Sequence, residues 1–218
     1  MKTALAIALL CISTLALAEK PAAVKGFYVE GTAGRTSFVF DSTANTTVDK
    51  TDSNYGGMVG YDFNDNFALE GGYRDIGEGS ISATGAFSGT VYGKPLTFTG
   101  TVTASGEARG WLFGPRVNLR FNDKVSGFVR GGLFRWDADT KVAASAAYVY
   151  DGVAYAGSST QSKSFSRSDT YWGLGINFDL SPQSSIGLGY SEFKFGGDLG
   201  ATLKKAQSVD LNLKYRFE

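Results

Sequence analysis

A regular alternation of apolar and polar residues runs through residues 109–136 and constrains the fold more than any other feature of the chain. In its first half every second residue is apolar, whereas the residues between are small or polar; the apolar set is Trp111, Phe113, Pro115, Val117, Leu119 and Phe121. A period of two is that of a β-strand. The apolar face could pack in a soluble core, or it could face lipid in a membrane barrel.

The N-terminal segment favours export across a membrane. Residues 1–18 combine Lys2, a run of apolar residues and a small-x-small ending at Ala16-Leu17-Ala18. These are the features of a secretory signal peptide rather than of a transmembrane helix. We therefore assign 1–18 to a signal peptide and 19–218 to one β-barrel domain. The single cysteine, Cys11, falls within this predicted signal, so the mature domain has no disulfide to form.

Eight predicted strands follow, with lengths of about ten residues that suit a tilted bilayer crossing. They are expected at 25–38, 54–63, 67–74, 109–121, 125–136, 168–180, 185–195 and 208–217. Their connections alternate between long and short, and the long ones cover 40–53, 75–105, 137–167 and 196–207. This spacing predicts an all-β, eight-stranded antiparallel up-and-down transmembrane barrel with short periplasmic turns and long extracellular loops.

Aromatic residues gather at the strand ends, as in the interfacial girdles of outer-membrane barrels. One group lies beside the short turns and the C-terminus, and Tyr73 and Trp111 lie towards the long loops; the first group is Tyr61, Phe63, Phe67, Phe121, Phe178, Tyr215 and Phe217. We therefore expect the apolar stripes to face lipid in the outer membrane of a Gram-negative bacterium. Arg135 falls on that lipid-facing side and is expected to extend to the outer rim.

Three segments resemble the transmembrane domain of outer membrane protein A: RGGLFRWDADTK (130–141), ALEGGYRDIG (68–77) and LNLKYRF (211–217). The resemblance implies an eight-stranded barrel with a solid, polar interior that holds little water. It also implies contact with outer-membrane lipid and lipopolysaccharide, and recognition of the last strand by the barrel-insertion machinery. Larger members carry a peptidoglycan-binding domain after the barrel, and we expect that role to be absent here.

Charged residues on the lumenal face should form ion pairs, because an isolated charge in so narrow a barrel is costly to bury. The residues predicted for these lumenal ion pairs are Glu70, Arg116, Arg130, Arg120 and Asp210. The resemblance places Glu70 and Arg116 where the family keeps a lumenal carboxylate and its cationic partner. The family's alternative arginine falls on Gly187 here, which disfavours a gate that works by exchange of partners.

Enzymatic function is not expected, because the chain has no histidine. Histidine is the usual general base near neutral pH. With no histidine and no cysteine outside the signal, transition-metal sites lack their usual ligands. We therefore predict no catalytic residues, no metal and no cofactor, and the near-neutral charge suggests no nucleic-acid partner.

Two tyrosine- and phenylalanine-bearing runs in the long connections are the candidate binding region, SGTVYGKPLTF (88–98) and AYVYDGVAYA (147–156). The Asp151-Gly152 pair is a strong hairpin signal, so these runs are expected to be strands that extend above the membrane. The candidate surface-binding residues are Tyr92, Phe98, Tyr148, Tyr150 and Tyr155. Two functions remain open: binding of host or other surface ligands (adhesion), with or without a structural role in the envelope, and a diffusion pore for ions or small solutes.

Overall fold

The computed structural model describes residues 25–40, 46–49, 51–197 and 203–217. The predicted signal peptide, 1–18, lies outside these residues. The strands are β1 (Gly26–Phe40), β2 (Thr46–Asp49), β3 (Thr51–Asp62), β4 (Phe67–Val91), β5 (Lys94–Arg120), β6 (Val125–Tyr150), β7 (Val153–Asp179), β8 (Ser184–Lys194) and β9 (Leu203–Arg216). Among the described residues no helix is long and apolar enough to cross a membrane.

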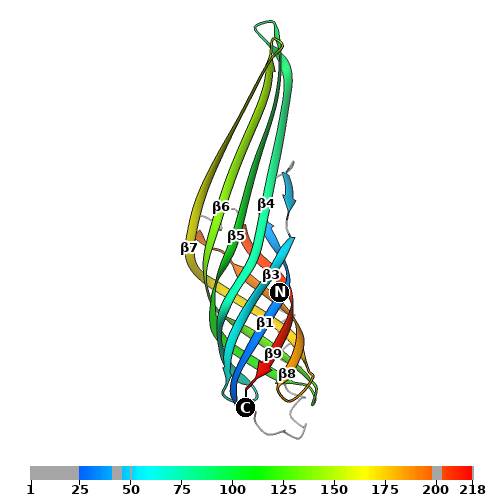
Figure 1. The fold of residues 1–218 in the computed structure, drawn as a ribbon, viewed down its shortest axis with the longest axis vertical. Coiled ribbons are helices and arrows are strands. Elements are labelled where there is room, and N and C mark those ends of the chain that lie inside the picture. Colours follow the sequence, from blue (N-terminus) through cyan, green and yellow to red (C-terminus); the bar gives the residue numbers. More distant parts are fainter. Residues whose placement is uncertain (1–24, 41–45, 50, 198–202, 218) are drawn as a thin grey trace, which may run out of the picture.

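Eight of these strands form a closed antiparallel barrel (Figure 1). The order around the wall is β1, β3, β4, β5, β6, β7, β8 and β9, and β1 pairs with β9 to close it. Each strand is a neighbour of the next along the chain, which is the up-and-down topology that the alternating connections predict. The remaining strand, β2, is not part of the ring and pairs with residues 80–83 of β4.

Side chains on the two faces of the wall have the predicted orientation. Trp111, Phe113 and Val117 are exposed on the outer face, while Leu112 and Arg116 between them are buried inside. Arg135 is also on the outer face, as expected. The barrel therefore presents its apolar stripe outwards and its charges inwards, the inverse of a soluble protein.

At one end of the barrel, the turn end, three tight turns cover residues 63–66, 121–124 and 180–183. In each turn, one polar side-chain oxygen accepts hydrogen bonds from two backbone N–H groups. Asn64 Oδ1 accepts from Asn66 and Phe67, Asn122 does the same one turn further on, and Ser181 Oγ repeats the arrangement. Short polar turns of this kind explain why the connections here need so few residues.

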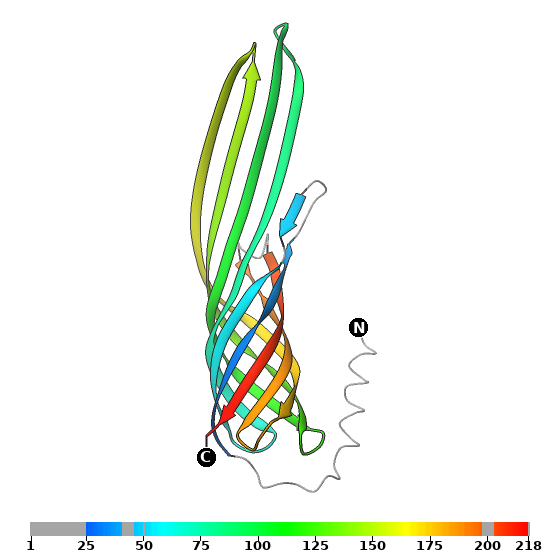
Figure 2. The same ribbon diagram turned by 45° about the vertical axis from the view of Figure 1, so that its right-hand side comes forward.

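At the opposite end, the hairpin end, the predicted loops are largely β-structure. β4–β5 and β6–β7 continue without a break far above the rim as two long hairpins (Figure 2). The expectation that residues 75–105 and 137–167 are loops is therefore wrong, and that of strands extending above the membrane is confirmed. Strand pairing also includes residues 46–49, 51–53 and 203–207, which were expected in loops.

The two hairpins join side by side into one four-stranded sheet, which we call the extension and define as Glu78–Glu107 plus Asp139–Ser164. Both hairpin tips have positive φ at two consecutive residues. These are Tyr92 (51°) with Gly93 (78°), and Asp151 (53°) with Gly152 (79°). Positive φ at both central residues defines a type I′ turn, whose twist suits long antiparallel hairpins. The Asp-Gly prediction is thus confirmed, and Tyr92-Gly93 forms a second such turn.

Candidate functional site: the closed lumen and the extension

A buried ion-pair cluster occupies the middle of the lumen, and Glu30 on β1 is its centre. Glu30 Oε2 lies 2.6 Å from Arg116 Nη1, and Glu30 Oε1 lies 2.7 Å from Arg130 Nη2. Strand β1 supplies the carboxylate, and the neighbouring strands β5 and β6, on which Arg116 pairs with Arg130, supply the guanidinium groups; all three residues are buried. A carboxylate that accepts from two guanidinium groups is a strong cross-lumen link.

Glu70 belongs to the same cluster but lies further from the arginines. Its carboxylate oxygens are 3.6 Å from Arg116 and 3.5 Å from Arg130, and Tyr28 donates its hydroxyl hydrogen to Glu70 at 2.9 Å. The ring of Phe128 lies 4.1 Å and 4.4 Å from the two guanidinium carbons. The pairing of Glu70 with Arg116 that the sequence suggested is thus present geometrically. Alternation also places Glu30 inside, but did not identify it as the closer partner of both arginines.

Arg74 and Asp210 form a second buried ion pair, between β4 and β9. Arg74 also donates to Asn54 Oδ1 at 2.8 Å and to Ser208 Oγ at 3.3 Å. Asp210 was predicted to take part in the lumenal ion pairs, and the structure supplies its cation from β4, three strands away around the wall. Ser208 donates in turn to Asp210, which extends the polar network across the two strands.

Arg120 does not join these deep pairs. It lies at the turn end, 37% exposed, with its Nη2 3.2 Å from Asp179 Oδ2. Together with Asp62 and Arg216 it lines an open hollow of about 440 Å³. Arg120 was predicted to lie inside because it continues the inward alternation, but the strand reaches the mouth of the barrel at that point.

The lumenal half nearer the hairpin end also holds an apolar cluster, beside buried polar residues such as Arg74 and Asn54. This buried cluster includes Phe134 and Trp136 of β6, Tyr171 of β7, Phe193 of β8, and Phe195, which directly follows β8. The Phe134 and Phe193 ring centroids are 5.0 Å apart, and those of Trp136 and Phe195 are 5.3 Å apart. We call this cluster the aromatic plug. The polar interior implied by the resemblance is therefore only part of this half, because the alternation there also places large apolar residues inside.

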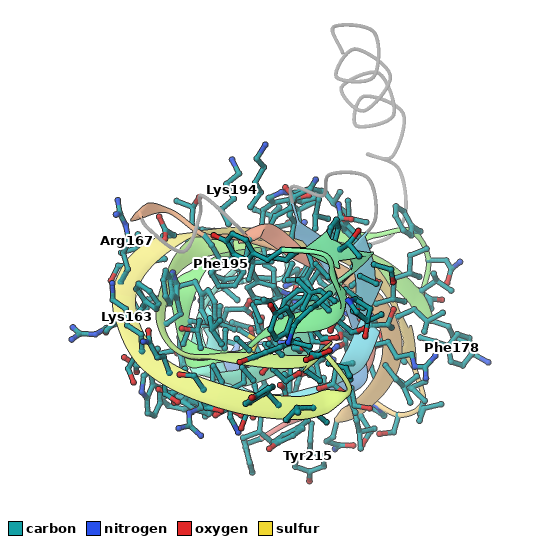
Figure 3. All side chains as sticks on the ribbon, turned by 90° about the horizontal axis from the view of Figure 1, so that it is seen from above. Lys163, Arg167, Phe178, Lys194, Phe195 and Tyr215 are labelled. Atoms are coloured by element: carbon teal, nitrogen blue, oxygen red, sulfur yellow. The ribbon has the colours of Figure 1, made fainter. Side chains whose placement is uncertain are left out.

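Gly187 leaves no room for the alternative charge partner discussed above. An added Cβ would lie 2.3 Å from Asn177 Oδ1 and 2.6 Å from the Ile176 carbonyl oxygen. Viewed from above, side chains fill the ring, with Phe195 within it and Phe178 and Tyr215 directed away from the wall (Figure 3). In the described part of the chain the lumen is thus closed by charged pairs below and by the aromatic plug above.

The extension has two chemically different faces. Because β6 pairs without interruption from Val125 to Tyr150, the side that faces the lumen in the barrel continues upwards as an inner face. The opposite, outer face is rich in threonine and serine, with hydroxyl pairs such as Ser82–Thr103 at 2.9 Å and Thr84–Thr101 at 3.1 Å. Polarity is thus reversed above the rim: the inner side becomes apolar and the outer side becomes polar.

The candidate surface residues divide between the tip and this inner face. Tyr92 is 96% exposed in the turn at one hairpin tip. Tyr150 directly precedes the Asp151-Gly152 turn at the other tip. Phe98, Tyr148 and Tyr155 are cross-strand neighbours in a single row. Phe87 completes this row opposite Phe98, and sequence reasoning missed it. Its position follows from the Tyr92-Gly93 turn, because a two-residue turn fixes which residues face each other.

Within the described ranges no three or more His, Cys, Asp or Glu residues are grouped so as to hold a metal ion. The described residues form a filled barrel that carries a tall, exposed sheet (Figure 2).

Comparison with known proteins places the chain in a family. The family model for the outer membrane protein beta-barrel domain matches residues 3–217. No curated protein sequence matches the chain.

Similar solved structures include Ail, the attachment invasion locus protein of Yersinia pestis, in complex with the heparin analogue sucrose octasulfate. It is 18% identical, with a TM-score of 0.47, over 88% of this chain and 99% of that one. The Neisserial surface protein A is 11% identical with a TM-score of 0.40, over 90% and 100% of the two chains. OprG from Pseudomonas aeruginosa is 9% identical with a TM-score of 0.44, over 90% and 97%. On the match of the family model to nearly its whole length, the chain belongs to the outer membrane protein β-barrel domain family and is an eight-stranded barrel of the Gram-negative outer membrane.

Proposed function

We propose that this protein is a non-enzymatic surface-binding protein that captures extended polypeptide segments at the free edge of its extension. The observation that carries the proposal is the one-sided pairing of β7. Within the described residues, β7 pairs with β6 from Val153 onwards, whereas its pairing with β8 begins only at Tyr171. Residues 153–170 therefore present backbone N–H and C=O groups along an exposed edge.

The composition of this edge suits strand addition. Natural sheets usually protect a free edge with proline, with many charges or with a covering segment. Residues 153–170 contain no proline, and their charged residues are Lys163, Arg167 and Asp169. On the other side of the extension β2 pairs with β4 at residues 80–83, and the described pairings leave 84–91 of β4 as a second, shorter edge. Added strands gain affinity from backbone hydrogen bonds and specificity from alternate side chains.

A diffusion pore is the less favoured alternative. Solutes would have to pass both the Glu30 cluster and the aromatic plug, and both consist of buried, mutually packed side chains. Breaking a buried ion pair typically costs about 3–5 kcal/mol. Opening both barriers at once therefore has a high free-energy cost. Purified protein in planar bilayers is expected to show no large, steady channels.

A shortened hairpin tests the proposal. Removal of residues 145–150 and 153–158 joins Ala144 to Asp151 and Gly152 to Ser159, and keeps the Asp151-Gly152 turn. Ala144 and Ser159, which then flank the turn, are already paired across the two strands. Because six residues leave each strand, the two faces keep their alternation. The probe is a fluorescent ten-residue peptide of alternating threonine and valine, and its binding to protein in detergent is measured by anisotropy. The shortened variant is expected to bind it at least about tenfold more weakly.

The matched control shortens the other hairpin, by removal of residues 86–91 and 94–99, so that Gly85 and Gly100 flank the Tyr92-Gly93 turn. The free edge of β7 stays intact, so peptide binding should be retained. Both variants should keep the different gel mobilities of boiled and unboiled samples that mark a folded barrel. Equal peptide binding by all three proteins, or by none of them, would overturn the edge proposal.

A further inference from the structure

The inner face of the extension is an apolar surface that stands uncovered above the barrel mouth. Phe87, Val102, Val142 and Tyr155 are between 43% and 56% exposed on it. Only four of the eight strands rise this far, so no opposing wall of described residues faces it (Figure 2). Contiguous apolar patches larger than about 300–600 Å² are unusual on a monomer and mark contact sites.

The surface of this inner face consists of a ridge of large side chains next to a groove. The ridge is the aromatic row of Phe87, Phe98, Tyr148 and Tyr155, in which the two tyrosine rings stack at 4.7 Å. The next row towards the barrel consists only of small residues, Gly85, Gly100, Ala146 and Gly157. This row lies in a groove of about 1030 Å³ that Phe98, Tyr148 and Tyr155 help to line; it is open at Gly85 and Gly157, while the Phe98 ring lies over Gly100, 2.9 Å from where a Cβ would be.

We propose that the occupant of this face is the same face of a second copy of this protein, inserted in a facing membrane. A ridge beside a groove is self-complementary under a two-fold axis that runs across the strands between the two rows. Such an axis puts each ridge into the partner's groove, which is the isologous arrangement of a symmetric dimer. The two sheets then stack about 10 Å apart, in the manner of a β-sandwich.

The register of this stack agrees with the length of the apolar face. With the axis between the rows of Phe87 and Gly85, Val91 at the tip lies over Ile81 of the other copy. The overlap therefore ends where β2 joins β4, just above the rim. It covers about 35 Å by 19 Å, on the order of 650 Å² per copy, which reaches the roughly 1,200–2,000 Å² total of a stable interface.

Charge does not oppose this contact. Along the inner face between Ile81 and the tips, Lys94 is the only charged residue, and its Nζ pairs with Asp151 of the neighbouring hairpin. Because depletion of charge marks the core of protein interfaces, two copies of this face can meet without burying like charges.

The axis also dictates that the partner comes from an opposing membrane. It runs across the strands, so it reverses the direction in which the barrel points. Each inner face looks over the mouth of its own barrel, because it continues the lumenal side of β4–β7 (Figure 1). Two copies in one membrane would hold their inner faces apart by the widths of both mouths. This contact uses the inner face and not the β7 edge, so it is independent of the proposed function.

Tethering of two differently labelled populations of proteoliposomes tests the inference, measured as two-colour coincidence. The groove-filled variant is Gly85→Leu with Gly157→Leu, and a Cβ added at either glycine meets nothing within 4 Å. The ridge-truncated variant is Phe87→Ala with Tyr148→Ala and Tyr155→Ala. Wild-type protein on both populations is expected to tether, and either variant paired with itself is expected to tether at least about tenfold less.

Mixing the two variants gives the sharpest outcome. The intact ridge of the groove-filled copy fits the open groove of the ridge-truncated copy, so this mixture should tether more than either variant alone. The control carries Thr97→Leu and Thr160→Leu, which lie on the outer face away from the groove, and should tether like wild type. Tethering that survives in the groove-filled variant, or that also occurs with protein-free liposomes, would overturn the inference, as would a wild-type protein that does not tether.

Discussion

Removal of the Glu30 carboxylate is expected to destabilise the barrel more than removal of the Glu70 carboxylate. In Glu30→Gln the amide nitrogen cannot accept from a guanidinium group, so one of the two short contacts at 2.6 Å and 2.7 Å is lost and the negative charge disappears. In Glu70→Gln the lost ion pairs are longer, at 3.6 Å and 3.5 Å. Glu70 in addition accepts the Tyr28 hydroxyl, which an amide oxygen still accepts.

The N···O distances of the ion pairs set the expected loss of unfolding free energy in each variant. With an effective dielectric constant of about 20, two unit charges attract by about 6 kcal/mol at 2.6 Å and by about 4.5 kcal/mol at 3.6 Å. Desolvation offsets much of both values, so the expected loss of unfolding free energy is about 3–5 kcal/mol for Glu30→Gln and about 1–3 kcal/mol for Glu70→Gln.

Urea unfolding in lipid vesicles, followed by tryptophan fluorescence, measures both losses. Glu78→Gln is the control, because Glu78 is exposed on the extension and should change the unfolding free energy by less than about 0.5 kcal/mol. Planar-bilayer recordings of the same variants should show no large, steady channels, because the aromatic plug remains. An equal or larger loss for Glu70→Gln would refute the view that Glu30 is the centre of the cluster, and steady channels in the Glu70 variant would show that this carboxylate gates a pore.

Three further predictions concern backbone and packing. Gly114→Ala should destabilise the barrel by about 1–3 kcal/mol in urea, since its Cβ would lie 2.1 Å from an opposing carbonyl oxygen, whereas Gly31→Ala, with no atom within 4 Å, should be nearly neutral. Phe134→Ala should cost about 3–5 kcal/mol by emptying part of the aromatic plug, and the neighbouring lipid-facing Leu133→Ala should cost less. Gly152→Val should strain the turn, where φ is 79°, by about 1–2 kcal/mol; hydrogen exchange should then quicken at that tip while the unfolding midpoint of the barrel stays unchanged.

The sequence determined the barrel because local rules were enough. Strict alternation at Trp111–Phe121 separated an apolar from a polar face. The predicted signal peptide and the rhythm of long and short connections then implied an up-and-down membrane barrel with the apolar face towards lipid. Asp151-Gly152 similarly identified one hairpin tip, because a type I′ turn depends on only two residues. Each of these features is carried by neighbours in the chain, so no knowledge of distant contacts was needed.

Only the tertiary structure decided which inward charges meet and which inward aromatic residues gather into one cluster. Alternation places Glu30 and Glu70 equally inside, but curvature and register of the closed wall bring Glu30 closer to both arginines. The same register gathers Phe134 and Phe193, which are distant in sequence, into the aromatic plug. It likewise aligns Phe87 with Tyr155 across four strands. Pairing partners across a barrel depend on how the strands are staggered, and period-two patterns do not encode stagger.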